Sequence, residues 1–140
     1  MQKKISHILK KEDFSSFPIV PKIGDRVFLR GDLGAGKTTL SRYIISTLLD
    51  KEIAVKSPTY VYYNRYGANV YHFDLYRLKS YDDFVNIGGE EILDNPDNIC
   101  LIEWPEIIMD RYEPTVDIEI LKTEKEDERE ARITCLSEKM

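Results

Sequence analysis

Four residues between positions 31 and 38 have the types and spacing of a site for a nucleoside triphosphate. Gly31, Gly36, Lys37 and Thr38 satisfy the pattern G-x-x-x-x-G-K-[ST]. The glycines let backbone N–H groups approach phosphate oxygens closely, because no Cβ stands in the way. We expect the lysine to bridge the β- and γ-phosphates and the threonine hydroxyl to ligate Mg²⁺. The predicted nucleotide-binding residues of this loop are Leu33, Gly34, Ala35, Gly36, Lys37, Thr38 and Thr39.

A phosphate loop needs a carboxylate from a neighbouring strand to position the metal and the attacking water. Glu103 ends the apolar run ICLIE, and Asp74 lies in YHFDLYR. Together with Thr38, both are predicted metal ligands, and Lys37, Asp74 and Glu103 are the predicted catalytic residues. The alternative is that each acid simply faces solvent at a strand end. We interpret His72 as a structural, hydrogen-bonding residue rather than a catalytic one.

The elements around the loop are those that the motif requires. Residues 27–29 are a compact apolar strand, and residues 37–49 carry apolar side chains at helical spacing. A strand, a glycine loop and a helix in this order are the expected context of the motif. NICLIEW is a continuous apolar run, which is typical of a central strand covered on both faces.

Further elements follow from turn signals. Gly67, Ala68 and Asn69 are the predicted turn of a hairpin, and the acidic segment that follows is predicted to form one or two short helices, broken at Gly88 and Gly89. Alternation around a charged turn predicts a C-terminal hairpin at about residues 115–136. The chain is therefore predicted to be a single α/β domain, residues 1–140, with a P-loop NTPase-like fold in which helices flank a central mixed sheet.

Composition excludes several classes of protein. The 140 residues carry a net charge of −5, which argues against a free-standing nucleic-acid binder. Cys100 and Cys135 lie in apolar runs without metal-site spacing, so buried thiols are expected. No apolar stretch reaches the length of a membrane span, and the N-terminus lacks the apolar core of a secretion signal. We expect a cytoplasmic protein.

Missing motifs narrow the reaction. The sequence has no N-K-x-D for guanine recognition and no arginine-rich lid after the loop. These absences favour hydrolysis or a nucleotide-dependent switch over transfer to a small molecule. A small P-loop kinase that phosphorylates a small-molecule acceptor is the alternative, and a binding module with incidental hydrolysis is a third interpretation.

Four segments together resemble the bacterial TsaE family, formerly YjeE. They are GDLGAGKTT at 31–39, SPTY at 57–60, HFDLYRL at 72–78 and LIEWPE at 101–106. The resemblance covers about residues 25–136. It implies a small, cytoplasmic Mg²⁺-dependent ATPase that supports the threonylcarbamoyladenosine modification of tRNA. It also implies partners: TsaD and TsaB, whose complex activates an otherwise weak ATPase, while tRNA is contacted only through that complex.

The resemblance also assigns roles to residues. Lys37 and Thr38 match the phosphate and magnesium positions, and Glu103 and Asp74 match the acids beside the metal. Ser57, Pro58, Thr59 and Tyr60 match a switch-like segment near the γ-phosphate. Arg129 matches an arginine of the C-terminal hairpin near the adenine edge. The N-terminal segment departs from the family because it is shorter and carries Pro18 and Pro21, so the other residues of the adenine pocket are not predicted.

Overall fold

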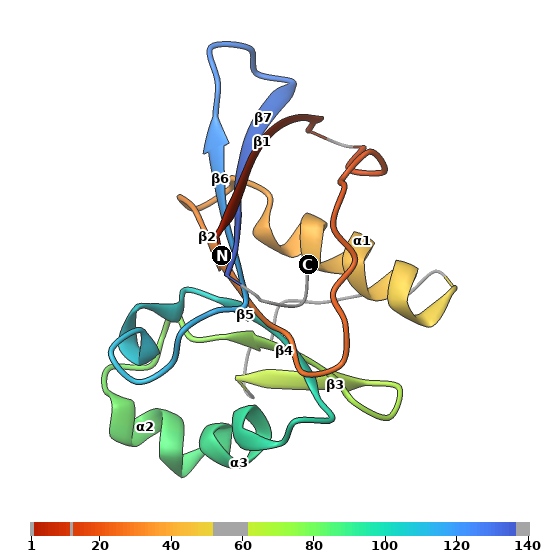
Figure 1. Ribbon diagram of the computed structural model, residues 1–140. Coiled ribbons are helices and arrows are strands. Elements are labelled where there is room, and N and C mark those ends of the chain that lie inside the picture. The colour runs from red at the N-terminus through yellow and green to blue at the C-terminus, as the bar shows by residue number, and fades with distance from the viewer. Residues whose placement is uncertain (1, 12, 52–61, 137–140) are drawn as a thin grey trace.

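Seven strands form one mixed sheet in the order β1-β7-β6-β2-β5-β4-β3 (Figure 1). The computed structural model describes residues 2–11, 13–51 and 62–136. Strands β5 and β6 run parallel to β2, and β4 runs parallel to β5, whereas the pairs β1–β7, β6–β7 and β3–β4 are antiparallel. The strands are β1 Lys3–Lys10, β2 Arg26–Arg30, β3 Tyr63–Tyr66, β4 Val70–Asp74, β5 Ile99–Glu103, β6 Val116–Lys122 and β7 Glu128–Cys135.

The helices lie on opposite faces of the sheet (Figure 1). Helix α1 packs on one face with the apolar side chains of β2, β6 and β7. Two short helices and a 3₁₀ turn pack on the other face, over β4 and β5. The bounds are α1 Lys37–Leu49, α2 Tyr81–Asn86, α3 Gly89–Asp94 and η1 Pro105–Ile108.

The two central strands are buried on both faces. In β2, Val27 and Leu29 belong to the core beneath α1, while Phe28 belongs to the core on the other face. All five residues of β5 are buried, and Leu101 and Ile102 face opposite cores in the same way. This explains the continuous apolar run of β5 and confirms the prediction of a doubly covered strand.

The other predicted elements are also confirmed. Helix α1 has the predicted bounds, and β3 and β4 pair around Gly67, Ala68 and Asn69. Helix α2 begins at a Ser80 cap, whose hydroxyl accepts a hydrogen bond from the Asp83 N–H at 3.2 Å. The single-domain α/β fold with a central mixed sheet and flanking helices is the fold class that the sequence predicts.

Both cysteines are buried free thiols, as expected, and burial raises the pKa of Cys100 to about 12. Within the described ranges, none of the helices combines the length and the apolarity that a bilayer crossing requires.

Candidate nucleotide-binding site

The phosphate loop, residues 31–38, links the end of β2 to the start of α1. Gly31 has a φ of 154°, and a Cβ there would lie 2.6 Å from the backbone oxygen of Ile120 in β6. Only glycine therefore lets the loop pack this closely on the sheet. Gly36 caps α1 with a φ of 115°, so the free N–H groups and the positive end of the helix dipole adjoin the loop.

The ammonium of Lys37 is held inside the loop. Its Nζ donates hydrogen bonds to the backbone oxygens of Gly31 at 2.6 Å and Asp32 at 2.9 Å. It also lies 4.2 Å from the ring centroid of Trp104, a cation–π contact. Burial lowers the pKa of Lys37, and the carboxylates of Glu103 and Asp74 partly offset this effect. The ammonium is thus desolvated and directed at the space that the loop encloses.

Glu103 lies at the centre of a buried hydrogen-bond network. The hydroxyl of Thr38 lies 3.3 Å from its Oε1 and 3.2 Å from its Oε2. On the other side, Nε2 of His72 lies 2.5 Å from Oε2 of Glu103, and both side chains are buried. In the neutral tautomer that carries its hydrogen on Nε2, the imidazole donates to Glu103. Nδ1 is buried and has no hydrogen-bond partner among the described residues.

Asp74 lies beside Glu103 because β4 and β5 are parallel neighbours. The two residues are paired in register at the carboxyl ends of their strands. Asp74 is half-buried, and its Oδ1 accepts a hydrogen bond from the Tyr76 N–H at 3.1 Å. Burial raises the pKa of Asp74, and the neighbouring Glu103 carboxylate raises it further, against the opposing effect of Lys37.

One pocket of about 280 Å³ brings together the side chains of Lys37, Thr38, Asp74 and Glu103. The pocket lies where the phosphate loop meets the ends of β4 and β5, a typical ligand position in an open α/β sheet. Its lining residues are Leu33, Gly34, Gly36, Lys37, Thr38, Thr39, Asp74, Glu103 and Trp104.

Trp104 follows the metal-site candidate Glu103 in a strained backbone conformation. Its φ of 57° and ψ of 59° are left-handed, which a bulky residue rarely adopts. This turn places the indole in contact with both Lys37 and Tyr76, and the centroids of the two aromatic rings are 4.8 Å apart. Strain of this kind is typically maintained at functional sites. The position after Glu103 is apparent in the sequence, but the contact with Lys37 is not.

Arg129 lies outside the pocket lining, behind the phosphate loop. It is 5% exposed, and its Nε donates a hydrogen bond to the backbone oxygen of Ala35 at 3.1 Å. The predicted contact with an adenine edge stays a prediction. A sequence signal for burial exists, because Arg129 shares the alternating phase of Ala131, Ile133 and Cys135, which are all buried.

The predicted switch-like segment Ser57, Pro58, Thr59 and Tyr60 lies outside the described residues. The side chain of Arg77, three residues after Asp74, is exposed and does not line the pocket.

The sequence of this chain is similar to those of known proteins. Residues 1–132 match the family model "Threonylcarbamoyl adenosine biosynthesis protein TsaE". The chain is 42% identical to a protein from Rickettsia conorii named "tRNA threonylcarbamoyladenosine biosynthesis protein TsaE", over 74% of this chain and 62% of that one. A protein of the same name from Bacillus subtilis is 35% identical over 82% of this chain and 72% of its own length.

A solved structure has the same fold. The crystal structure of YdiB from Bacillus subtilis superposes with a TM-score of 0.71 at 26% identity, covering 98% of this chain and 88% of that one. The match to the Rickettsia conorii protein covers 62% of that protein, which is less than two thirds of its length. The family match over most of the chain, the identities and the shared fold together show that this chain belongs to the TsaE family.

Proposed function

We propose that this protein is a Mg²⁺-dependent ATPase that supports the threonylcarbamoyladenosine modification of tRNA and is activated by the TsaB–TsaD complex. The observation that carries the proposal is one pocket in which Lys37, Thr38, Asp74 and Glu103 meet at the start of α1. Related proteins are named for this tRNA modification. The grouping of these four side chains in one pocket supports the part of the proposal that concerns nucleotide binding.

The residues present fit a magnesium ion held together with phosphates. Thr38 offers a hydroxyl, and Glu103 and Asp74 offer carboxylates, all within one pocket. Mg²⁺ in nucleotide sites is typically bound by one or two carboxylates plus substrate phosphate oxygens. When bound, it would neutralise charge that develops on the phosphates. Thr38, Glu103 and Asp74 would hold it, and Asp74 would also help to orient the attacking water.

Lys37 and the loop would bind the phosphates. The Lys37 ammonium has only to exchange the carbonyls of Gly31 and Asp32 for phosphate oxygens. The N-terminal end of α1 adds backbone N–H donors and the positive end of the helix dipole. These groups position and neutralise the triphosphate, which is most of what catalysis of phosphoryl transfer requires.

The same pocket supports the proposal of partner activation. Among the described residues that line it, Lys37 is the only cationic side chain. An arginine supplied in trans can accelerate nucleotide hydrolysis by about 10³–10⁵-fold in NTPases of this kind. We therefore place the missing charge on the TsaB–TsaD complex, which makes this chain a weak ATPase when it is alone.

The test is ATP hydrolysis by the purified chain, alone and with the cognate TsaB–TsaD pair. We expect slow hydrolysis alone and strong stimulation by the pair. Lys37→Ala should abolish both rates. Asp74→Ala and Glu103→Ala should abolish hydrolysis and, in a reconstituted system, repeated rounds of modification.

Two results would contradict the proposal. Stoichiometric phosphate transfer to a nucleoside or sugar would establish a kinase. Repeated modification that continues with Asp74→Ala, while hydrolysis is lost, would establish a nucleotide-dependent binding module instead.

A further inference from the structure

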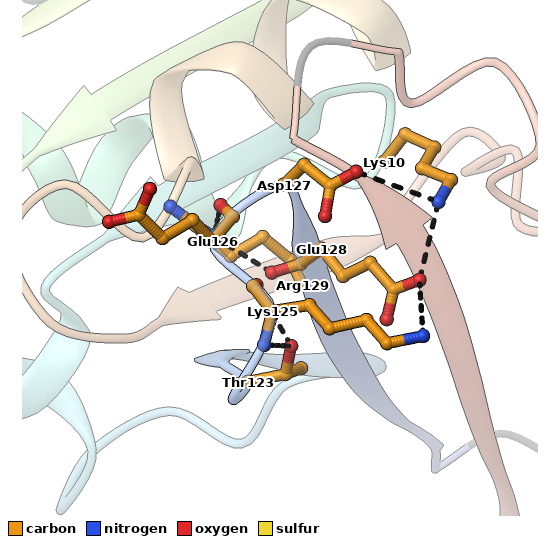
Figure 2. Close-up of polar contacts among 7 residues, drawn as sticks. All are labelled: Lys10, Thr123, Lys125, Glu126, Asp127, Glu128 and Arg129. Carbon is orange, nitrogen blue, oxygen red and sulfur yellow. Dashed lines mark hydrogen bonds and ion pairs between the residues drawn. The ribbon is translucent and has the colours of Figure 1, made fainter.

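Arg129 joins the C-terminal hairpin to the phosphate loop through backbone atoms. Its Nε donates to the backbone oxygen of Ala35 at 3.1 Å. Its NH1 group donates to the backbone oxygens of Glu126 at 3.0 Å and Glu128 at 2.8 Å. Figure 2 shows Arg129 together with the side chains of the turn between β6 and β7. One buried guanidinium thus fixes three carbonyl groups from two distant segments.

The charge of Arg129 is not neutralised by a neighbouring acid. Among the described residues, no carboxylate forms an ion pair with it. The carboxylate of Glu128 is directed instead to the ammonium groups of Lys10 and Lys125, at 3.3 and 3.9 Å (Figure 2). A buried cation without a counter-charge is costly. Because no carboxylate offsets its charge, the Arg129 guanidinium contributes a positive potential next to Ala35 of the phosphate loop.

The contact with Ala35 also determines the orientation of one peptide group. In a trans peptide, the carbonyl and the following N–H point in opposite directions. No peptide bond in the described part of the chain is cis. Because the Ala35 carbonyl points to Arg129, the N–H of Gly36 points away from it. Gly36 lines the pocket, where an N–H can meet a phosphate.

The backbone of Gly36 leaves the orientation of this peptide open. Rotation of the Ala35–Gly36 peptide changes ψ of Ala35 and φ of Gly36 together. Glycine adopts either sign of φ readily, so Gly36 does not by itself select one orientation. The buried methyl group of Ala35 and its N–H, which donates to Asp32 at 3.0 Å, anchor the residue before the peptide but not the peptide plane.

We propose that Arg129 is a positioning residue for phosphate binding. Its guanidinium holds the Ala35 carbonyl so that the Gly36 N–H faces the pocket, and its unpaired charge attracts the anion. The inference rests on the proposed function for the identity of the ligand only. The orientation of the peptide is a property of the nucleotide-free protein and can be tested without a ligand.

The test compares Arg129→Lys and Arg129→Met with Arg132→Lys. Arg132 lies on the same strand, is exposed and pairs with Glu130 at 3.3 Å, so it is a matched control. In ¹⁵N-labelled, nucleotide-free protein, we expect the Gly36 amide resonance to shift or broaden in both Arg129 variants and to stay unchanged in the control. Affinity for pyrophosphate and for Mg·ADP should fall about tenfold or more in both, because a hydrogen bond to a charged group is lost.

A structural role alone predicts a different pattern. If Arg129 only attaches the hairpin, both variants lower the unfolding temperature but leave the affinities for pyrophosphate and Mg·ADP unchanged. That result would overturn the inference. Should Arg129→Met fail to fold, Arg129→Lys retains the charge and the stem and decides the question alone. Partial recovery of affinity in Arg129→Ala on addition of methylguanidinium would support the inference further.

Failure of the proposed function would be recognised separately. In that case the unmodified protein binds neither pyrophosphate nor Mg·ADP. The Gly36 resonance of Arg129→Lys still reports whether the guanidinium orients the peptide.

Discussion

Nε2 of His72 and Oε2 of Glu103 lie 2.5 Å apart in the interior, although 31 residues separate the two in sequence. The contact exists because β4 and β5 are parallel neighbours whose ends are in register. Glu103 also contacts Thr38 at the start of α1. The imidazole therefore orients a carboxylate that we propose as a metal ligand, a role that hydrogen-bonded partners of ligands commonly have.

Replacement of His72 should destabilise the fold and weaken metal binding. His72→Ala leaves the buried carboxylate of Glu103 with the Thr38 hydroxyl but without the imidazole, so we expect the free energy of unfolding to fall by about 1–3 kcal/mol. The affinity for Mg²⁺ with nucleotide should fall about 10–100-fold. The control is His7→Ala: His7 lies on β1 and contacts the Ser16 hydroxyl at 3.1 Å. Its effect should stay within about 0.5 kcal/mol. Equal urea midpoints for the two variants would contradict the prediction.

Asp74→Asn should stabilise the nucleotide-free protein at neutral pH. In the folded protein, burial is the main cause that raises the pKa of Asp74 above its ordinary value. A raised pKa gives a stability contribution that is fully present below the unfolded pKa and is lost as pH rises through the folded value. Asparagine removes this loss, so we expect a rise in the unfolding temperature on the order of 1–3 °C at pH 7.

The pH dependence and a control make this prediction specific. The difference between Asp74→Asn and the unmodified protein should disappear about one pH unit below the unfolded aspartate pKa of about 3.9, where Asp74 is protonated in both states. Asp117→Asn should have the opposite sign at pH 7, because Arg30 donates to both Asp117 oxygens, at 2.9 and 2.8 Å. A lower unfolding temperature for Asp74→Asn at pH 7 would contradict the argument.

Nucleotide binding should change the fluorescence of Trp104. It is the only tryptophan of the chain, and its ring lies 4.2 Å from the Lys37 ammonium. Phosphates should draw the ammonium away from the indole and the loop carbonyls. We expect a saturable change in emission on titration with Mg·ADP and none with Lys37→Met. Calorimetric binding without any change in emission would show that the cation–π contact persists in the complex.

Gly31→Ala should be far more harmful than the same change at Gly88. A methyl group at residue 31 would meet the backbone oxygen of Ile120 at 2.6 Å, and that backbone belongs to a central part of the sheet. We expect the free energy of unfolding to fall by about 3 kcal/mol, because overpacking and the positive φ both destabilise the variant.

The control isolates the steric part of that loss. Gly88 has a φ of 87°, and nothing lies within 4 Å of a Cβ there. Gly88→Ala should therefore cost only about 1 kcal/mol, from the backbone conformation alone. Chemical denaturation of both variants measures the difference, and equal losses would show that the loop can move away from β6.

The local elements of this protein can be predicted from its amino-acid sequence. The strand before Gly31, the loop and the helix from Lys37 follow from apolar spacing and glycine positions, because these signals act between residues close in the chain. The central position of β5 follows from its unbroken apolar run, since a strand buried on both faces has no polar phase. Glu103 could be proposed from its place at the end of that run.

The contacts between distant residues depend on the order and register of the strands. The strand order places Asp74 and His72 beside Glu103, and long-range pairing of strands leaves no short-range pattern in the sequence. Arg129 is the clearest case, since its partner at Ala35 is a backbone oxygen 94 residues away. Every residue has such an oxygen. The side-chain types therefore cannot reveal the partner, and the packing of the C-terminal hairpin against the phosphate loop selects it.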